Sequence, residues 1–242
     1  MLTFSMLIFF KIFRRCFSKL SSGSSSGKEG FTLIELLVVS SIMLVITAFT
    51  LFQQAKFNSS TLLRSLTYSV ALSVRQAQVY GTSVRGFVSA GSVTFGNGYG
   101  IQFPPNSAPY QYYLFYDPSS GAGNDGTRAA DGTEDLKPPS PFTFGQGYKL
   151  NQVCTRIGSA DPVCDNAMTL TVFFRRPNPE ACISTSVQPT LCSPTGTPIY
   201  NSAYVVLGSN GNTDTRSIKI TDTGQIAICK PNLNTPAALA TC

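Results

Sequence analysis

The feature that most constrains this chain is the segment 31–55, in which Glu35 is the only charged residue. As a helix with a rise of 1.5 Å per residue, the segment would be about 37 Å long, enough to cross the hydrocarbon core of a bilayer with some tilt. An ionisable side chain inside such a span is costly and marks a functional position by default. The sequence therefore predicts a membrane-spanning helix and makes Glu35 the first candidate functional residue.

The net positive charge of the chain is concentrated before this segment. Residues 1–30 contain five basic residues and one acidic residue, a net charge of +4, whereas residues 31–242 contain 13 basic and 11 acidic residues, a net charge of +2. Basic residues before a hydrophobic span keep that end in the cytoplasm. We therefore expect a cytoplasmic leader, with a flexible Ser/Gly spacer at 21–27, and the export of everything after residue 55.

Six of the seven cysteines lie in the part that we expect to be exported. An even number of cysteines in an oxidising compartment favours disulfides. The chain contains no histidine and no C-x-x-C pair, so a zinc site is the weaker reading. Many pairings are possible, and the simplest has three sequential pairs that close short loops: Cys154 with Cys164, Cys182 with Cys192, and Cys229 with Cys242.

A run of fifty residues, 31–80, contains neither glycine nor proline, which predicts one long helix. Its first half is apolar on all sides. In its second half apolar residues recur every three or four positions (Leu62, Leu63, Leu66, Val70, Val74 and Ala77), while Arg64, Arg75, Gln76 and Gln78 fall elsewhere. This half, 56–81, should lie on a sheet, and Gly81 should end the helix in a left-handed conformation.

After this helix the pattern changes to short β-rich runs separated by turn residues. We expect strands at 83–90, 99–103, 110–116, 168–174, 203–208, 216–220 and 225–229, the last three in an antiparallel meander. The intervening regions 117–150 and 175–200 are rich in Gly, Pro and Asp and should be long irregular loops, which at this length are functional or disordered. The predicted fold class is α+β, with a β-rich globular domain at 82–242.

The start of the span carries a specific motif, Lys28-Glu29-Gly30 followed by Phe31-Thr32-Leu33-Ile34-Glu35-Leu36-Leu37-Val38. It resembles the class III signal of type IV prepilins and type II secretion pseudopilins. The resemblance implies that prepilin peptidase cleaves after Gly30 and methylates the new amino group of Phe31. It also implies a single-pass subunit of the bacterial inner membrane that is passed by an assembly platform into a periplasmic or extracellular filament.

The role of Glu35 follows from the same resemblance and from the cost of a charge in lipid. In a bundle of such helices, the nearest unpaired cation for this carboxylate is the terminal amine of another subunit. Glu35 and Phe31 would then carry assembly, while Leu33 to Val39 would pack in the filament core. The alternative is an ordinary signal anchor that tolerates one acid.

A second resemblance covers residues 65–84 and 203–229, which are similar to H-type minor pseudopilins and T-type fimbrial proteins. These families place the helix against antiparallel sheet and assemble near the tip of a short filament. Some T-type relatives are DNA-uptake pilins, so the alternative function is a tip subunit that binds DNA or a surface ligand. Its candidate residues are Arg175, Arg176, Arg216 and Lys219, because clustered cations bind phosphates by releasing counterions.

One loop gathers five carboxylates between glycines: Asp117, Asp125, Asp131, Glu134 and Asp135. Oxygen ligands on a flexible loop suit Ca²⁺, although the spacing is not that of an EF-hand. The competing reading is a solvated acidic loop.

The sequence contains few residues that could support catalysis. The chain has no histidine, its exported cysteines are expected to be oxidised, and no serine stands in a nucleophile elbow or a Ser-x-x-Lys setting. We therefore expect the chain to be an enzyme substrate and not an enzyme.

Overall fold

The structure is a computed structural model that describes residues 32–83, 85–89, 92–95, 98–105, 110–118, 125–136, 140–145, 147–187, 199–208 and 214–229. Four candidate residues, Gly30, Phe31, Cys192 and Cys242, lie outside these ranges. The chain divides into two compact units, residues 1–52 and residues 53–242.

One long helix, α2 (Leu33–Thr82), occupies the region where the sequence predicts it. Its start is capped by Thr32, whose hydroxyl oxygen accepts the backbone N–H of Glu35 at 3.3 Å and whose carbonyl accepts that of Leu36 at 3.2 Å. Thr-x-x-Glu at a helix start is the sequence of a capping box. The local sequence therefore fixes where this helix begins.

The predicted role of Gly81 as a left-handed helix stop is wrong. The helix continues through Gly81 to Thr82, and Gly81 is not in the left-handed region. A Cβ atom at Gly81 would lie 2.5 Å from the carbonyl oxygen of Phe174. Glycine is required here because a strand passes directly against the helix backbone.

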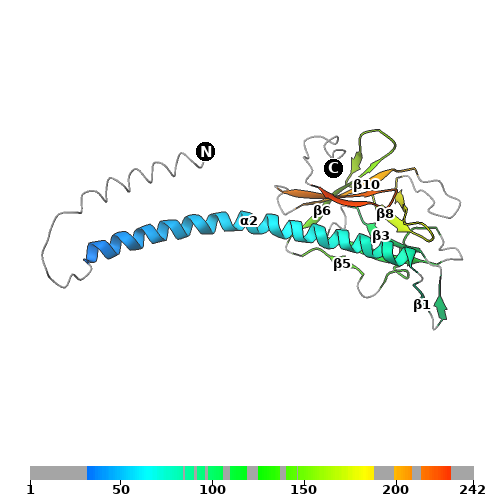
Figure 1. The fold of residues 1–242 in the computed structure, drawn as a ribbon, viewed down its shortest axis with the longest axis horizontal. Coiled ribbons are helices and arrows are strands. Elements are labelled where there is room, and N and C mark those ends of the chain that lie inside the picture. Colours follow the sequence, from blue (N-terminus) through cyan, green and yellow to red (C-terminus); the bar gives the residue numbers. More distant parts are fainter. Residues whose placement is uncertain are drawn as a thin grey trace. The chain divides into compact units, whose positions relative to one another are not determined.

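The strands form two five-stranded antiparallel sheets and one small hairpin (Figure 1). The first sheet has the order β5-β4-β3-β8-β9, with β3 (Gly98–Phe103) in its centre, and the second has the order β12-β11-β10-β6-β7, with β10 (Ser202–Gly208) in its centre. The other strands are β1 (Phe87–Ser89) and β2 (Ser92–Thr94) of the hairpin, β4 (Gln111–Asp117), β5 (Phe142–Thr143), β6 (Lys149–Arg156), β7 (Val163–Asp165), β8 (Leu170–Phe174), β9 (Ala181–Thr185), β11 (Thr215–Thr221) and β12 (Ile226–Cys229).

The seven predicted strands all contain observed strands, and β10, β11 and β12 form the expected meander. Five strands were not predicted: β2, β5, β6, β7 and β9. Of these, β6 is eight residues long and pairs with β10 along its whole length, although its sequence, KLNQVCTR, does not alternate clearly. The expectation of unbroken loops at 117–150 and 175–200 is therefore wrong at β5, at the start of β6 and at β9.

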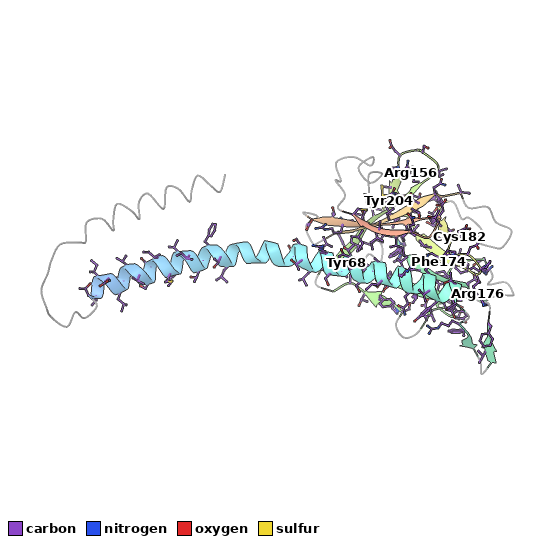
Figure 2. All side chains as sticks on the ribbon, in the orientation of Figure 1. Tyr68, Arg156, Phe174, Arg176, Cys182 and Tyr204 are labelled. Carbon is purple, nitrogen blue, oxygen red and sulfur yellow. A yellow bond between two sulfur atoms is a disulfide. The ribbon has the colours of Figure 1, made fainter. Side chains whose placement is uncertain are left out.

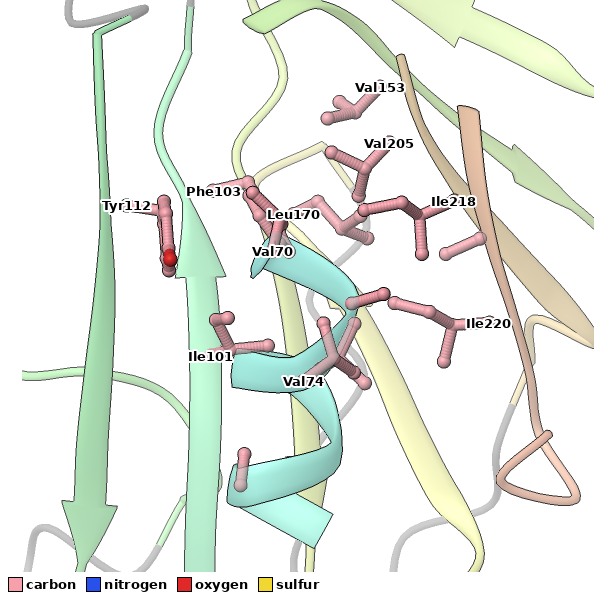
Figure 3. Packing of buried hydrophobic residues seen from close by; sticks show 14 of the residues in the cluster. Val70, Val74, Ile101, Phe103, Tyr112, Val153, Leu170, Val205, Ile218 and Ile220 are labelled. Atoms are coloured by element: carbon pink, nitrogen blue, oxygen red, sulfur yellow. The ribbon is translucent and has the colours of Figure 1, made fainter. Parts of the chain in front are cut away.

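A single hydrophobic core joins the second half of α2 to both sheets (Figure 3). Val70 and Val74 of the helix lie between Ile101 on one sheet and Ile220 on the other. The buried helix positions include four of the six predicted ones, namely Leu63, Val70, Val74 and Ala77, while Leu62 and Leu66 are partly buried. A helix packed on antiparallel sheets makes this an α+β, pilin-like arrangement.

Gln78 departs from the prediction because it lies on the buried side of the helix. Its side-chain amide donates to the carbonyl oxygens of Pro179 at 2.9 Å and Gly224 at 3.0 Å. Pro179 lies between β8 and β9, and Gly224 lies in the turn between β11 and β12. This one amide thus connects the helix to both sheets.

The structure joins Cys154 and Cys164 by a disulfide, one of the three pairs that the sequence analysis considers simplest. Cys182 and Cys229 are also disulfide-bonded. The expected partners of these two, Cys192 and Cys242, lie outside the described residues, so their pairing stays a prediction.

Candidate functional site

The first half of α2 has the surface of a membrane span. Residues Leu33–Leu51 have a mean hydropathy of 2.3, and none of these residues is buried inside the structure. Large apolar side chains stand on all sides of the helix, as Figure 2 shows, and Leu33 and Leu44 are 85% and 70% exposed. Within the described ranges this is the only helix long and apolar enough to cross a membrane.

The hydroxyl groups in this half are satisfied by the helix itself. Ser40 donates to the carbonyl of Leu37, Ser41 to that of Val38, Thr47 to those of Met43 and Leu44, and Thr50 to that of Thr47, all at 2.8 to 3.0 Å. A polar group without a partner is expensive in hydrocarbon. These four residues therefore do not need water or a second helix, and the segment suits lipid.

Glu35 differs from the serine and threonine residues of the span in how its side chain is bonded. Its backbone N–H is capped by Thr32, and it stands in the first turn of α2, where a negative charge interacts favourably with the helix dipole. No hydrogen bond or ion pair engages its carboxylate in the described part of the chain, and its side chain is exposed. The structure thus presents an acid at a fixed position on an apolar surface, and that acid has no partner among the residues that the structure describes.

Comparison with known proteins bears on this same stretch. The family model of the prokaryotic N-terminal methylation motif matches residues 25–51. The chain carries a type IV prepilin-like class III signal. The motif is that of type IV pilin-like proteins, which are structural subunits. No curated protein and no solved structure matches the chain.

The motif, the exposed span and an acid without a partner among the described residues coincide in one short region of the chain. Such a surface can associate laterally with other helices, and its carboxylate can accept a cation that another chain brings to the same depth. The residues at which the resemblance predicts cleavage and methylation, Gly30 and Phe31, lie just before the described part of the helix.

Four of the five carboxylates of the acidic loop bond to other residues of the same loop. Asp125 and Asp131 each accept hydrogen bonds from a threonine two residues later, Glu134 accepts the N–H of Ala129, and Asp135 forms a two-pronged ion pair with Arg128 at 2.5 and 2.8 Å. No group of three or more His, Cys, Asp or Glu side chains that could hold a metal occurs among the described residues. The arrangement gives the calcium hypothesis no support.

Asp117, at the end of β4, is the exception in this group because it is fully buried. One carboxylate oxygen accepts the N–H of Gly126, while the other accepts no hydrogen bond and lies 3.8 Å from the Arg175 guanidinium. Burial raises the pKa of Asp117 to about 7, although Gly126 and Arg175 both act to lower it. Burial also raises the pKa of the nearby Glu134. This region is therefore a buried electrostatic cluster inside the globular unit, residues 53–242.

The four basic residues proposed for DNA do not share one face. Arg216 and Lys219 stand three positions apart on β11, so their side chains leave opposite faces of that strand. Arg175 and Arg176 follow β8 in the other sheet, and the Arg175 guanidinium faces Asp117. The structure thus does not gather these residues into the single patch that the hypothesis requires.

Two residues with specific contacts were missed in the sequence. Thr32 could have been found, since Thr-x-x-Glu before an apolar run is a capping signal. Gln78 carries no such signal, because its two acceptors belong to turns far away in the sequence.

Proposed function

We propose that this chain is a minor pilin or pseudopilin subunit, which is cut after Gly30 by prepilin peptidase, methylated on Phe31, and assembled through its N-terminal helix into a type IV pilus or a type II secretion-like filament. The match of residues 25–51 to the methylation motif carries this proposal. In it, residues 1–30 are the leader, 31–55 the membrane-spanning half of the helix, 56–81 its amphipathic half, and 82–242 the exported domain.

The chemistry of assembly rests on Glu35. A lone carboxylate in lipid either takes up a proton or finds a cation, because the charged form is strongly disfavoured there. Cleavage after Gly30 would create a new amine four residues before Glu35. Within one chain this amine lies at nearly the same depth as the carboxylate, so the amine of a neighbouring subunit can meet it when two helices pack side by side.

The residues before the helix and those after it both agree with the proposed topology. The basic leader favours a cytoplasmic N-terminus, and the disulfide between Cys154 and Cys164 is typical of a domain in an oxidising compartment. The exported domain would decorate the filament, and the partners are other pilin subunits, the peptidase and the assembly platform.

The test is the N-terminal mass of the full chain extracted from membranes, expressed with and without a prepilin peptidase. We expect the peptidase to yield a chain that begins with N-methylated Phe31. A Gly30→Leu variant, which places a bulky side chain at the cleavage point, should stay uncut. The matched control is Ser41→Ala, a change inside the span but away from the motif, and this variant should be processed normally.

An uncut wild-type chain in the presence of an active peptidase would contradict the proposal. A plain membrane anchor with a tolerated acid would then be the better account. The DNA-binding alternative shares the same processing, and the separation of its four basic residues gives no observation that favours it.

A further inference from the structure

Among the described residues, each of the two large sheets has two edge strands: β12 and β7 in one sheet, and β5 and β9 in the other. An edge strand presents unpaired N–H and C=O groups that can pair with another chain. A subunit that must associate through its helix needs such edges to be closed, because edge pairing would compete with the intended contact.

Three of these four edge strands carry a disulfide-bonded cysteine: Cys229 on β12, Cys164 on β7 and Cys182 on β9. The fourth edge strand, β5, is only two residues long. Very short strands are one of the ways in which natural sheets avoid edge pairing. The disulfides therefore lie on edge strands, which are the strands that separate most easily from a sheet.

The best-defined case is the bond between Cys154 and Cys164. These residues are directly opposite one another on β6 and β7, with Cα atoms 4.0 Å apart. Among the described residues β7 pairs with β6 alone, through three residue pairs. Three pairs on one side hold a strand only weakly, so the disulfide adds a covalent attachment of β7 to β6 beside the short turn, residues 157–162, that connects the two strands.

Behind β7 lies the long strand β6. One side of β6 is paired with β10 over its whole length, but the other side is covered by β7 only from Val153 to Thr155. The part that β7 leaves uncovered is interrupted at Asn151, where the register with β10 shifts, and such bulges turn an edge away from partners. The regular part of the edge is thus the part under β7.

We propose that the Cys154–Cys164 disulfide is a gatekeeper: it holds β7 over β6 and so prevents two copies of this chain from joining edge to edge. The occupant of the opened edge is a second copy, because every subunit exposes the same strand and antiparallel pairing of two identical strands is closed by a two-fold axis. This inference goes beyond the proposed function and does not depend on cleavage or filament assembly.

The experiment uses the full chain in detergent micelles, in a Cys16→Ser background that removes the leader thiol. We compare the oxidised parent with a C154S/C164S variant by light scattering and by hydrogen exchange. We expect the parent to be monomeric and the variant to form dimers as its concentration rises. Amides of β6 should exchange faster in the dilute variant and become protected again in the dimer.

Two further variants keep the test decisive. C154V/C164V replaces both sulfurs by apolar groups that preserve packing against Tyr204 and Val206, and it should dimerise in the same way. Adding Gln152→Lys to either variant places a charge beside the opened edge and should restore the monomer.

Two results would overturn the proposal. The first is a variant that releases β7, with fast exchange there, and yet stays monomeric at every concentration. The second is association that is accompanied by loss of protection in β10 and β11, or that Gln152→Lys does not reverse, since this would indicate general unfolding and not edge pairing.

Discussion

The two halves of α2 are one continuous helix, yet they have opposite relations to the rest of the chain. None of the residues from Leu33 to Leu51 is buried, whereas from Leu63 to Gly81 one face of the helix is buried almost completely. The apolar surface of the first half requires lipid or other helices. The second half contributes to the hydrophobic core of the globular unit, residues 53–242.

This difference separates assembly from stability. A change in the first half should alter association with other subunits without affecting the globular unit, and a change on the buried face of the second half should do the reverse. The following four predictions test that separation.

The largest effect is expected for Glu35→Gln. The variant keeps the shape and the helix cap but loses the negative charge, so we expect normal membrane insertion and a nearly complete loss of incorporation into filaments. The measurement is the amount of subunit in sheared or membrane-extracted filaments. Unfolding of the globular unit should be unchanged, and normal filament content would break the proposed separation.

Leu63→Ala should have the opposite profile. Leu63 is fully buried in the core, so its truncation should lower the free energy of unfolding by about 2–5 kcal/mol. The matched control is Leu72→Ala on the same half of the helix, where the side chain is 68% exposed and the change should be within about 0.5 kcal/mol. Denaturant unfolding of both variants in detergent checks this, and equal losses would contradict the observed packing.

Asp117 predicts a pH dependence that is confined to the globular unit. Its pKa is raised from 3.8 to about 7 by burial, so between these values the folded chain holds a proton that the unfolded chain has lost. The stabilisation is complete below pH 3.8 and is lost as the pH rises through about 7. Unfolding measured across this range should show stability falling with rising pH, and Asp117→Asn should flatten the curve. An unchanged slope in that variant would assign the dependence to another group.

The smallest effect is expected for Gln78→Ala, which leaves the carbonyls of Pro179 and Gly224 without their donor. We expect a loss of about 1–3 kcal/mol in the free energy of unfolding. Gln76→Ala is the control, because that half-buried side chain donates only to the hydroxyl of Tyr80 and should cost less. Similar losses for both would show that the link between the helix and the two sheets is not important for stability.

The sequence predicted the elements that have a strong local signal. The long helix follows from fifty residues without glycine or proline, and β10, β11 and β12 follow from alternating apolar residues separated by tight turns. The strands β6 and β9 were missed because their residues are mixed in polarity. They are strands because β10 and β8 lie beside them and offer hydrogen bonds.

In the candidate site, too, the features with a local sequence signal could be predicted and those that depend on distant segments could not. The motif around Glu35 is local, so it could be read directly and it agrees with the family model. The functions of the acidic loop and of the basic residues could not be predicted in this way. Whether charged side chains converge depends on which face of a strand each side chain leaves. Arg216 and Lys219 are close in sequence but leave opposite faces of β11, and Asp117 is a buried acid because β4 ends inside the globular unit.

The sequence by itself determined the span, its lone acid, the start of the helix and the α+β class, since each of these depends on neighbouring residues along the chain. Only the tertiary structure decided that Gly81 gives room to β8, that Gln78 connects two sheets, and that Cys164 lies opposite Cys154 at a sheet edge. These features depend on contacts between segments far apart in the sequence, and no local pattern specifies which segments will meet.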